Sequence, residues 1–174
     1  QDSTWVYWQA RALLTQGTPA DQARAQALLG SIAGVDGFYE QLAAEDLGQA
    51  VLPPPEPQPP TAEEIARAHA NPGLTRALYA IRIGLRSEGV REWNYTTNLH
   101  QPGGMHDRDL LAAAAIACQA QVWDRCINTS ERTKSFVSWQ QRYPMPFKDE
   151  VVTRARTIGL DPAYVYGLIR QESR

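Results

Sequence analysis

Apolar residues recur at spacings of three and four through most of the chain, and the apolar–polar alternation of a half-buried strand is absent. This spacing predicts helices over residues 4–16, 21–33, 38–47, 61–70, 74–87, 90–99, 108–120, 123–134, 147–158 and from 162 onward. Helices joined by short loops pack as antiparallel neighbours. The pattern therefore predicts an all-α fold, an irregular helical-hairpin superhelix (α-solenoid) with no strict repeat period.

Cap and stop residues set the expected ends of these helices. Thr61 and Glu64 have the spacing of a capping box, which opens the helix that follows them. Asp107 is expected to be the N-cap of the 108–120 helix, and Gly89 is expected to stop the 74–87 helix. Before the last helix, Asp161 is expected to be an N-cap, with proline at the first helical position.

A proline-rich stretch divides the chain. Residues 53–60 are all proline except for Glu56 and Gln58. Proline fixes φ and lacks an amide hydrogen, so we expect a polyproline-like linker here; binding to a proline-recognition domain is the less favoured alternative. A second change in character, two prolines bracketed by aromatic residues at 143–147, predicts a further domain boundary near residue 140.

Composition and charge exclude some classes of protein. The formal net charge of −2 and the lack of a basic stripe argue against nucleic-acid binding. The longest apolar run, residues 110–118, is too short to span a bilayer, so no membrane span is expected. The N-terminus has no signal-peptide pattern, which predicts a cytoplasmic protein or a mature or excised product of a secreted one. The end at Arg174, directly after a strong helical pattern, favours an excised product.

Cys118 and Cys126 are eight residues apart and are expected on either side of a helix–helix turn, where their Cβ atoms could meet. A disulfide between them would close a short loop and contribute about 2–3 kcal/mol in the chain-entropy model. The alternative is a pair of small apolar core residues in a reduced protein. His69, His100 and His106 form no recognisable ligand pair, so no metal site is expected.

One carboxylate stands out on the last predicted helix. Val165, Leu168 and Ile169 precede Glu172 by seven, four and three positions, so Glu172 is expected to continue their apolar stripe while Arg170 faces water. A carboxyl on a core-facing stripe should have a raised pKa, as general-acid attack on a glycosidic oxygen requires. The alternative is a glutamate in the last helical turn that points to solvent.

The C-terminal sequence resembles a known family. Residues 143–147 and 159–174 look like the entry to the lysozyme-like catalytic domain of soluble lytic transglycosylases, whose catalytic glutamate belongs to an Arg-Gln-Glu-Ser motif matching Glu172. Residues 8–12 and 38–48 resemble the last hairpins of the family's superhelical domain, and residues 92–93 and 110–132 resemble its linker domain.

The resemblance implies that the chain consists of four segments. These are the end of a superhelical domain (1–50), a proline-rich linker (51–60), a helical linker domain (61–140) and the first helices of a lysozyme-like domain (141–174). The family's Gly-Leu-Met-Gln segment and later substrate-binding aromatic residues do not follow Glu172, so we expect this chain to be an inactive fragment of an active parent.

The resemblance also implies a reaction. Such enzymes are lyases that cut the MurNAc-β-1,4-GlcNAc bond of peptidoglycan without water and leave 1,6-anhydroMurNAc ends. Glu172 would act first as acid and then as base, with Ser173 supporting it, and no metal or organic cofactor is expected. Peptidoglycan glycan strands are the expected partner, cell-wall synthases are a further class of partner left open, and the expected compartment is the periplasm of a Gram-negative bacterium.

Two other functions stay open: a non-enzymatic helical-repeat scaffold that binds proteins, and a hydrolase of lysozyme or chitinase type. Two sets of side chains have both a structural and a ligand-binding interpretation, and the structural one is favoured for each. The arginines are expected on a solvated helix face paired with Glu88 and Glu92, rather than on anionic peptidoglycan stems: Arg82, Arg86 and Arg91. The tryptophans are expected in core and inter-helix packing rather than stacked on sugars: Trp5, Trp8, Trp93, Trp123 and Trp139.

Overall fold

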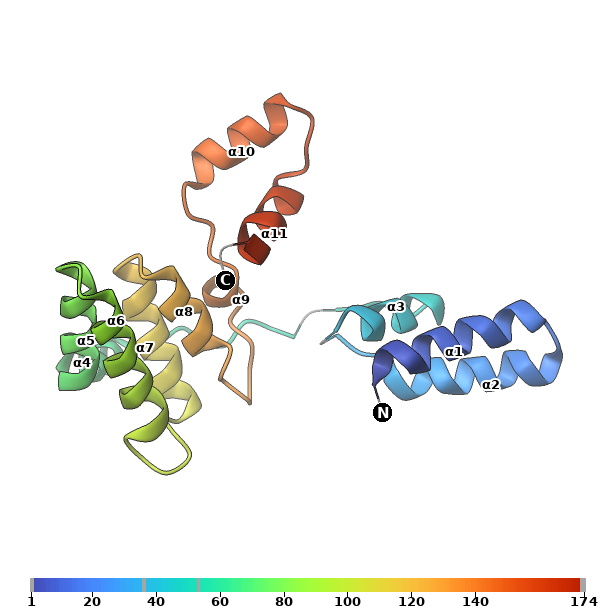
Figure 1. The fold of residues 1–174 in the computed structure, drawn as a ribbon, viewed down its shortest axis with the longest axis horizontal. Coiled ribbons are helices and arrows are strands. Elements are labelled where there is room, and N and C mark those ends of the chain that lie inside the picture. The colour runs from blue at the N-terminus through green and yellow to red at the C-terminus, as the bar shows by residue number, and fades with distance from the viewer. Residues whose placement is uncertain (1, 36, 53, 173–174) are drawn as a thin grey trace. The chain divides into compact units, whose positions relative to one another are not determined.

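The computed structural model describes residues 2–35, 37–52 and 54–172, and helices make up its regular elements over these ranges (Figure 1). Two compact units, Gln1–Pro54 and Pro55–Arg174, divide the chain. The first holds α1 (Ser3–Gln16), α2 (Pro19–Ile32) and α3 (Phe38–Asp46). The second holds α4 (Ala62–Ala70), α5 (Pro72–Arg82), α6 (Arg86–Asn94), the π-helical turn η1 (Tyr95–Leu99), α7 (Asp107–Gln119), α8 (Trp123–Ser130), α9 (Trp139–Arg142), α10 (Lys148–Thr157) and α11 (Pro162–Glu172). The predicted all-α class is confirmed.

The first unit is a helical hairpin covered by α3. Its core contains Tyr7, Ala10, Ala25, Leu29 and Ala43, and the three alanines are fully buried. Alanine at these positions lets the helix backbones come close together, because its side chain occupies little of the space between two helices. The unit therefore depends on close helix packing more than on large apolar side chains.

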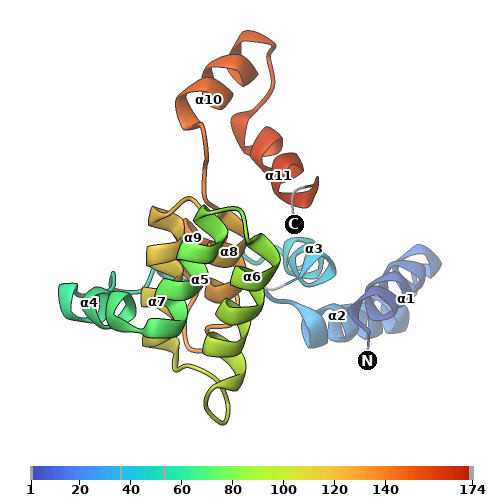
Figure 2. The ribbon, with the colours of Figure 1, turned by 60° about the vertical axis from the view of Figure 1, so that its left-hand side comes forward.

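The second unit is built from hairpins in the same way. The helices α5 and α6 pack as antiparallel neighbours, as do α7 and α8, and α4 packs on α7 (Figures 1 and 2). Trp93 of α6 is 1% exposed and lies in a core with Leu74, Ile116 and Cys126. This core holds the hairpins in one body.

The turn between α5 and α6 differs from the prediction. The chain reverses at Gly84, whose φ of 92° is left-handed, and α6 begins at Arg86, so the expected stop at Gly89 is wrong. Gly89 is buried within α6, where a Cβ would lie 2.6 Å from the carbonyl oxygen of Ala77. Gly89 therefore allows α5 and α6 to approach closely, which periodicity alone does not distinguish from a helix stop.

Asp107 also has a different role from the one expected. It is the first residue of α7, and His106 precedes it as the N-cap. The Asp107 carboxylate accepts hydrogen bonds from the backbone amides of Lys134 and Ser135, at 2.9 and 2.6 Å, and from the Ser135 hydroxyl. The chain between α8 and α9 is therefore fastened to the start of α7, and α8 ends at Ser130, short of the predicted residue 134.

The proline-rich stretch is more than a spacer, because residues 55–60 are fastened to the second unit. The Glu56 carboxylate accepts hydrogen bonds from Ser138 Oγ at 2.5 Å and from the Trp139 amide at 2.7 Å. Arg108 donates to the carbonyl oxygens of Gln58 and Pro59, at 2.7 and 3.2 Å. We call residues 55–60 the proline strap; it joins the N-terminal ends of α7 and α9.

Arg108 also joins the strap to the capping box of α4. Thr61 and Glu64 form both of the predicted reciprocal hydrogen bonds. The Glu64 carboxylate also pairs with the Arg108 guanidinium at 2.5 Å. Hydrogen bonding from Arg108, and next from the Thr61 amide, lowers the pKa of Glu64 to about 2.

The five tryptophans differ in burial, and Trp123 and Trp139 are half-buried. Trp93 is buried, as the packing interpretation predicts, but Trp5 and Trp8 are 74% and 55% exposed, so that interpretation is wrong for these two.

The arginine face is partly as expected: Arg91 pairs with Glu88 at 3.3 Å. The expected pairing with Glu92 is wrong, because Arg76 occupies that carboxylate. Arg82 and Arg86 have other neighbours, the ring of Tyr79 and the carboxylate of Asp124.

Candidate functional site

The helix that carries Glu172 begins as the sequence predicts. Gly159 ends the preceding turn with a φ of 74°. Asp161 Oδ1 then accepts a hydrogen bond from the Ala163 amide at 2.8 Å, so the predicted N-cap is confirmed. Pro162 occupies the first helical position and α11 runs to Glu172. The Asp161 carboxylate is therefore occupied as a cap at the opposite end of the helix from Glu172.

Glu172 lies at the end of α11 with its side chain exposed. The apolar stripe that was expected to bury it is itself open, since Leu168 is 54% and Ile169 is 37% exposed. None of the described residues of α11 is buried. The expectation of a core-facing Glu172 is wrong in this structure, because among the described residues α11 packs mainly on α10. Ser173, expected to support Glu172, lies outside the described residues.

Arg170 links α11 to the segments around α8 and α9. Its guanidinium pairs with Glu131 Oε1 at 2.6 Å and its Nε donates to the Arg142 carbonyl oxygen at 3.1 Å. The same group lies 4.5 Å from the centre of the Tyr143 ring, a cation–π contact. The expectation that Arg170 faces water is wrong, because Arg170 pairs with Glu131. Glu131 lies 39 residues earlier in the chain, so the spacing of residues along α11 contains no information about this contact.

Tyr166 makes a second contact between α11 and the chain before α10. Its hydroxyl donates to the carbonyl oxygen of Pro146 at 2.8 Å. Burial, and next the negative charges of Glu150 and Asp149, raise the pKa of this phenol. Tyr166 therefore stays protonated at neutral pH and keeps its hydrogen bond.

An apolar pocket of about 300 Å³ lies between α8, the prolines before α10, and α11. Its lining includes Ile127, Pro146, Phe147, Tyr166 and Ile169. Phe147 has a φ of 51°, a left-handed conformation that is uncommon outside glycine, and its side chain is 76% exposed. The change in sequence character around residues 143–147 thus corresponds to a real change in the backbone, where the chain turns into α10.

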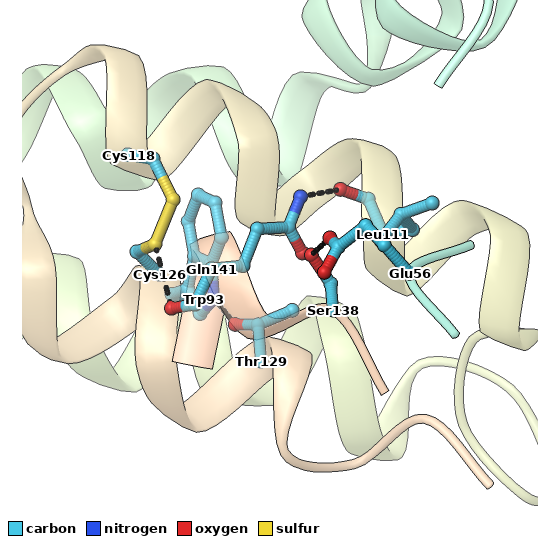
Figure 3. The surroundings of a disulfide bond; sticks show 8 residues. All are labelled: Glu56, Trp93, Leu111, Cys118, Cys126, Thr129, Ser138 and Gln141. Atoms are coloured by element: carbon cyan, nitrogen blue, oxygen red, sulfur yellow. Dashed lines mark hydrogen bonds between the residues drawn. A yellow bond between two sulfur atoms is a disulfide. The ribbon is translucent and has the colours of Figure 1, made fainter. Parts of the chain in front are cut away.

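The two cysteines form a disulfide between the end of α7 and the start of α8 (Figure 3). Their Cα atoms are 5.0 Å apart, so the prediction that they flank a helix–helix turn is confirmed. Cys126 Sγ lies 3.3 Å from the Gln141 carbonyl oxygen, and Gln141 Nε2 donates to the Leu111 carbonyl oxygen at 2.9 Å. The disulfide is therefore enclosed between α7, α8 and α9, close to the buried Trp93.

The structure gathers no group of three or more His, Cys, Asp or Glu side chains that could hold a metal ion, as far as its described residues reach. Over those same residues, no helix has the length and apolar character needed to cross a bilayer. Among the described residues, the candidate site holds one exposed carboxylate, Glu172 at the end of α11, and an anchoring arginine, Arg170, two residues before it.

Helical hairpins thus lead through the proline-interrupted segment 143–147 to a capped helix that ends in Arg-Gln-Glu. No protein-family model matches the chain. It is 26% identical over 178 residues to the soluble lytic murein transglycosylase of Salmonella typhimurium, a match that covers 97% of this chain and 25% of the relative.

Three solved structures of lytic transglycosylases also match the fold of the chain. The lytic transglycosylase Slt of Pseudomonas aeruginosa, in an inactive glutamate-to-glutamine mutant, matches 98% of this chain with a TM-score of 0.72 and 25% identity, over 27% of its own length. The 70-kDa soluble lytic transglycosylase in complex with bulgecin A matches 99% of the chain with a TM-score of 0.74 and 22% identity, over 26% of its length. The Escherichia coli enzyme SLT70 matches 99% of the chain with a TM-score of 0.72 and 22% identity, over 26% of its own length.

The chain is therefore related to the soluble lytic transglycosylases, and the predicted resemblance is confirmed. It spans about a quarter of the length of these relatives.

Proposed function

We propose that the complete gene product is a peptidoglycan lytic transglycosylase that cleaves the MurNAc-β-1,4-GlcNAc bond and leaves 1,6-anhydroMurNAc ends. One observation carries the proposal: sequence and fold match such enzymes over nearly the whole chain, and the match includes the helix that ends in Glu172. The Pseudomonas relative is inactive as a glutamate-to-glutamine mutant, which supports a glutamate as the essential group in that enzyme.

In the proposed reaction, Glu172 donates a proton in the first step and accepts a proton in the second. As acid it protonates the glycosidic oxygen, and the C1–O bond to the leaving GlcNAc breaks. As base it then takes the proton from the C6 hydroxyl of the same MurNAc, whose oxygen bonds to C1. The carboxyl is protonated again at the end, no water is consumed, and one carboxylate suffices. Asp161 is no second catalyst, since it caps the other end of the helix, about 16 Å away by the rise per residue.

The 174-residue chain by itself is proposed not to cleave glycan, because the Glu172 side chain is exposed to water. General-acid catalysis depends on a carboxyl held against the substrate in a site that excludes water. For the isolated chain, a scaffold that binds other proteins through its helical hairpins is the second function to test, and the exposed Trp5 and Trp8 support testing it.

The proposed compartment is the periplasm of a Gram-negative bacterium. A disulfide persists in an oxidising compartment, and the Cys118–Cys126 bond supports that location. The relatives from Salmonella and Pseudomonas support the same assignment. Glycan strands of peptidoglycan are the proposed substrate, and cell-wall synthases are proposed as protein partners.

Mass spectrometry of the products separates the candidate functions. The complete gene product is incubated with purified peptidoglycan, and the new reducing ends are weighed. Anhydro-muropeptides support the transglycosylase. Products heavier by one water would identify a hydrolase of lysozyme type, and an absence of cleavage together with stable binding of a specific protein would favour the scaffold.

A further inference from the structure

We propose that Arg170 is a positioning residue for Glu172. By anchoring α11 to the body of the second unit, it fixes the rotation of this helix about its axis, so that the Glu172 carboxyl faces away from α8 and α9. The inference rests on the proposed function, because it names the device that orients the proposed acid.

Helix geometry makes this connection direct. Residues two apart on an α-helix differ by about 200° around the axis and about 3 Å along it. A side chain at 170 that points into the unit therefore places the side chain at 172 on the opposite face. Arg170 has only 20% of its side chain exposed, whereas Glu172 is in the open, as this geometry requires.

Tyr166 supports the same rotation. It lies four residues before Arg170, so the two side chains share one face of α11. Its hydroxyl bonds to the Pro146 carbonyl oxygen at 2.8 Å, one turn before the Arg170 contacts. No described side chain of α11 is buried, so these polar contacts on one face act together with the packing of α11 on α10 to orient the helix.

The Arg170 site matches an arginine in three ways. The guanidinium meets a carboxylate at Glu131, a carbonyl oxygen at Arg142 and an aromatic face at Tyr143. The Tyr143 ring is itself stacked on Trp139, with centres 5.6 Å apart and an interplanar angle of 26°. A planar cation with several donors can satisfy all three contacts at once, whereas a lysine ammonium is a point charge without a stacking face.

The cluster is also less exposed than an ordinary surface ion pair. The side chains of Arg170 and Glu131 are 20% and 25% exposed, against 75% and 55% for Arg91 and Glu88 on α6. Exposed pairs contribute little to a fixed geometry, because solvent screens them and both side chains remain mobile. The Arg91–Glu88 pair is therefore a matched control with the same chemistry and no link to α11.

The test uses the complete gene product with purified peptidoglycan. Arg170→Ala and the nearly isosteric Glu131→Gln should each lower kcat by about 10- to 100-fold, the cost of a misdirected catalytic group, with KM changed by less than about threefold. Arg170→Lys should recover part of the loss, because it keeps the charge opposite Glu131. Arg91→Ala should behave as wild type.

A second readout follows the helix itself. Amide hydrogen exchange of residues 166–172 should speed up in Arg170→Ala and Glu131→Gln, while α7 keeps its protection. The proposal is overturned if both variants retain wild-type kcat, or if KM rises and kcat does not fall. Failure of the proposed function looks different: Glu172→Gln would then cleave as well as wild type, or the wild-type protein would not cleave at all.

Discussion

The indole Nε1 of Trp93 donates a hydrogen bond to Thr129 Oγ1 at 2.8 Å, and both side chains are almost fully buried (Figure 3). The bond joins α6 to α8 across 36 residues of sequence. Trp93 is the largest fully buried side chain of the second unit, so its one polar atom needs a partner inside the core. Thr129 supplies that partner.

Thr129→Val should destabilise the second unit by about 1–3 kcal/mol, because it keeps the shape of the side chain but leaves the indole N–H without an acceptor. Urea unfolding followed by tryptophan fluorescence measures the change. Thr129→Ser is the matched control, since it keeps the hydroxyl and loses one methyl group. A valine variant as stable as wild type would contradict the role given to this bond.

Loss of the Cys118–Cys126 disulfide should lower the free energy of unfolding of the second unit by about 2–3 kcal/mol, the entropy of closing a loop of this length. The measurement is a urea titration with and without dithiothreitol. A Cys118→Ala/Cys126→Ala variant is the control, and reductant should not change its midpoint. Equal midpoints for the wild-type protein under both conditions would contradict the prediction.

Glu64 should make the stability of the second unit fall in acid. Its folded-state pKa of about 2 lies below the ordinary value of 4.5, so its contribution is complete above about pH 4.5 and is lost as the pH falls towards 2. Glu64→Gln should flatten the stability profile between these pH values. Glu63→Gln is the control, because it removes the same charge at the neighbouring position without touching Arg108. If the stability profile of Glu63→Gln were as flat as that of Glu64→Gln, the pH dependence could not be assigned to Glu64.

Glu56 should hold the proline strap in place. Glu56→Ala removes the acceptor for Ser138 Oγ and the Trp139 amide, so we expect a loss of about 1 kcal/mol and faster hydrogen exchange at the Trp139 amide. Gln58→Ala is a control within the strap, because only the backbone carbonyl of Gln58 receives a hydrogen bond from Arg108. Unchanged exchange at Trp139 in the Glu56 variant would show that the strap is held by other contacts.

Local sequence patterns predicted most of the helices and several of their ends, but not the short α9 or the π-helical turn η1. The Thr61–Glu64 capping box and the Asp161 cap were found because each depends on residues within one turn. The error at Gly89 has a physical cause, because a glycine that stops a helix and a glycine that lets two helices touch look the same in one sequence. Contacts between helices decide which of the two it is.

Contacts between distant segments were beyond the sequence patterns. Arg170 was expected in water, yet it pairs with Glu131, which directly follows α8 and lies 39 residues earlier in the chain. Glu56 was assigned to a bare linker, although its carboxylate caps α9 more than 80 residues later. The role proposed for Glu172 rests on family resemblance and not on its apolar stripe, since Leu168 and Ile169 of that stripe are exposed in the structure.

The central claim is that Glu172 is the acid and base of a peptidoglycan transglycosylase. Its most direct test is the rate at which the complete gene product and its Glu172→Gln variant release anhydro-muropeptides from purified peptidoglycan. Asp161→Asn is the control on the same helix, because asparagine is as good an N-cap as aspartate and should leave the rate unchanged. We predict a loss of at least about 100-fold for Glu172→Gln in a folded variant; a rate within about twofold of wild type would contradict the assignment.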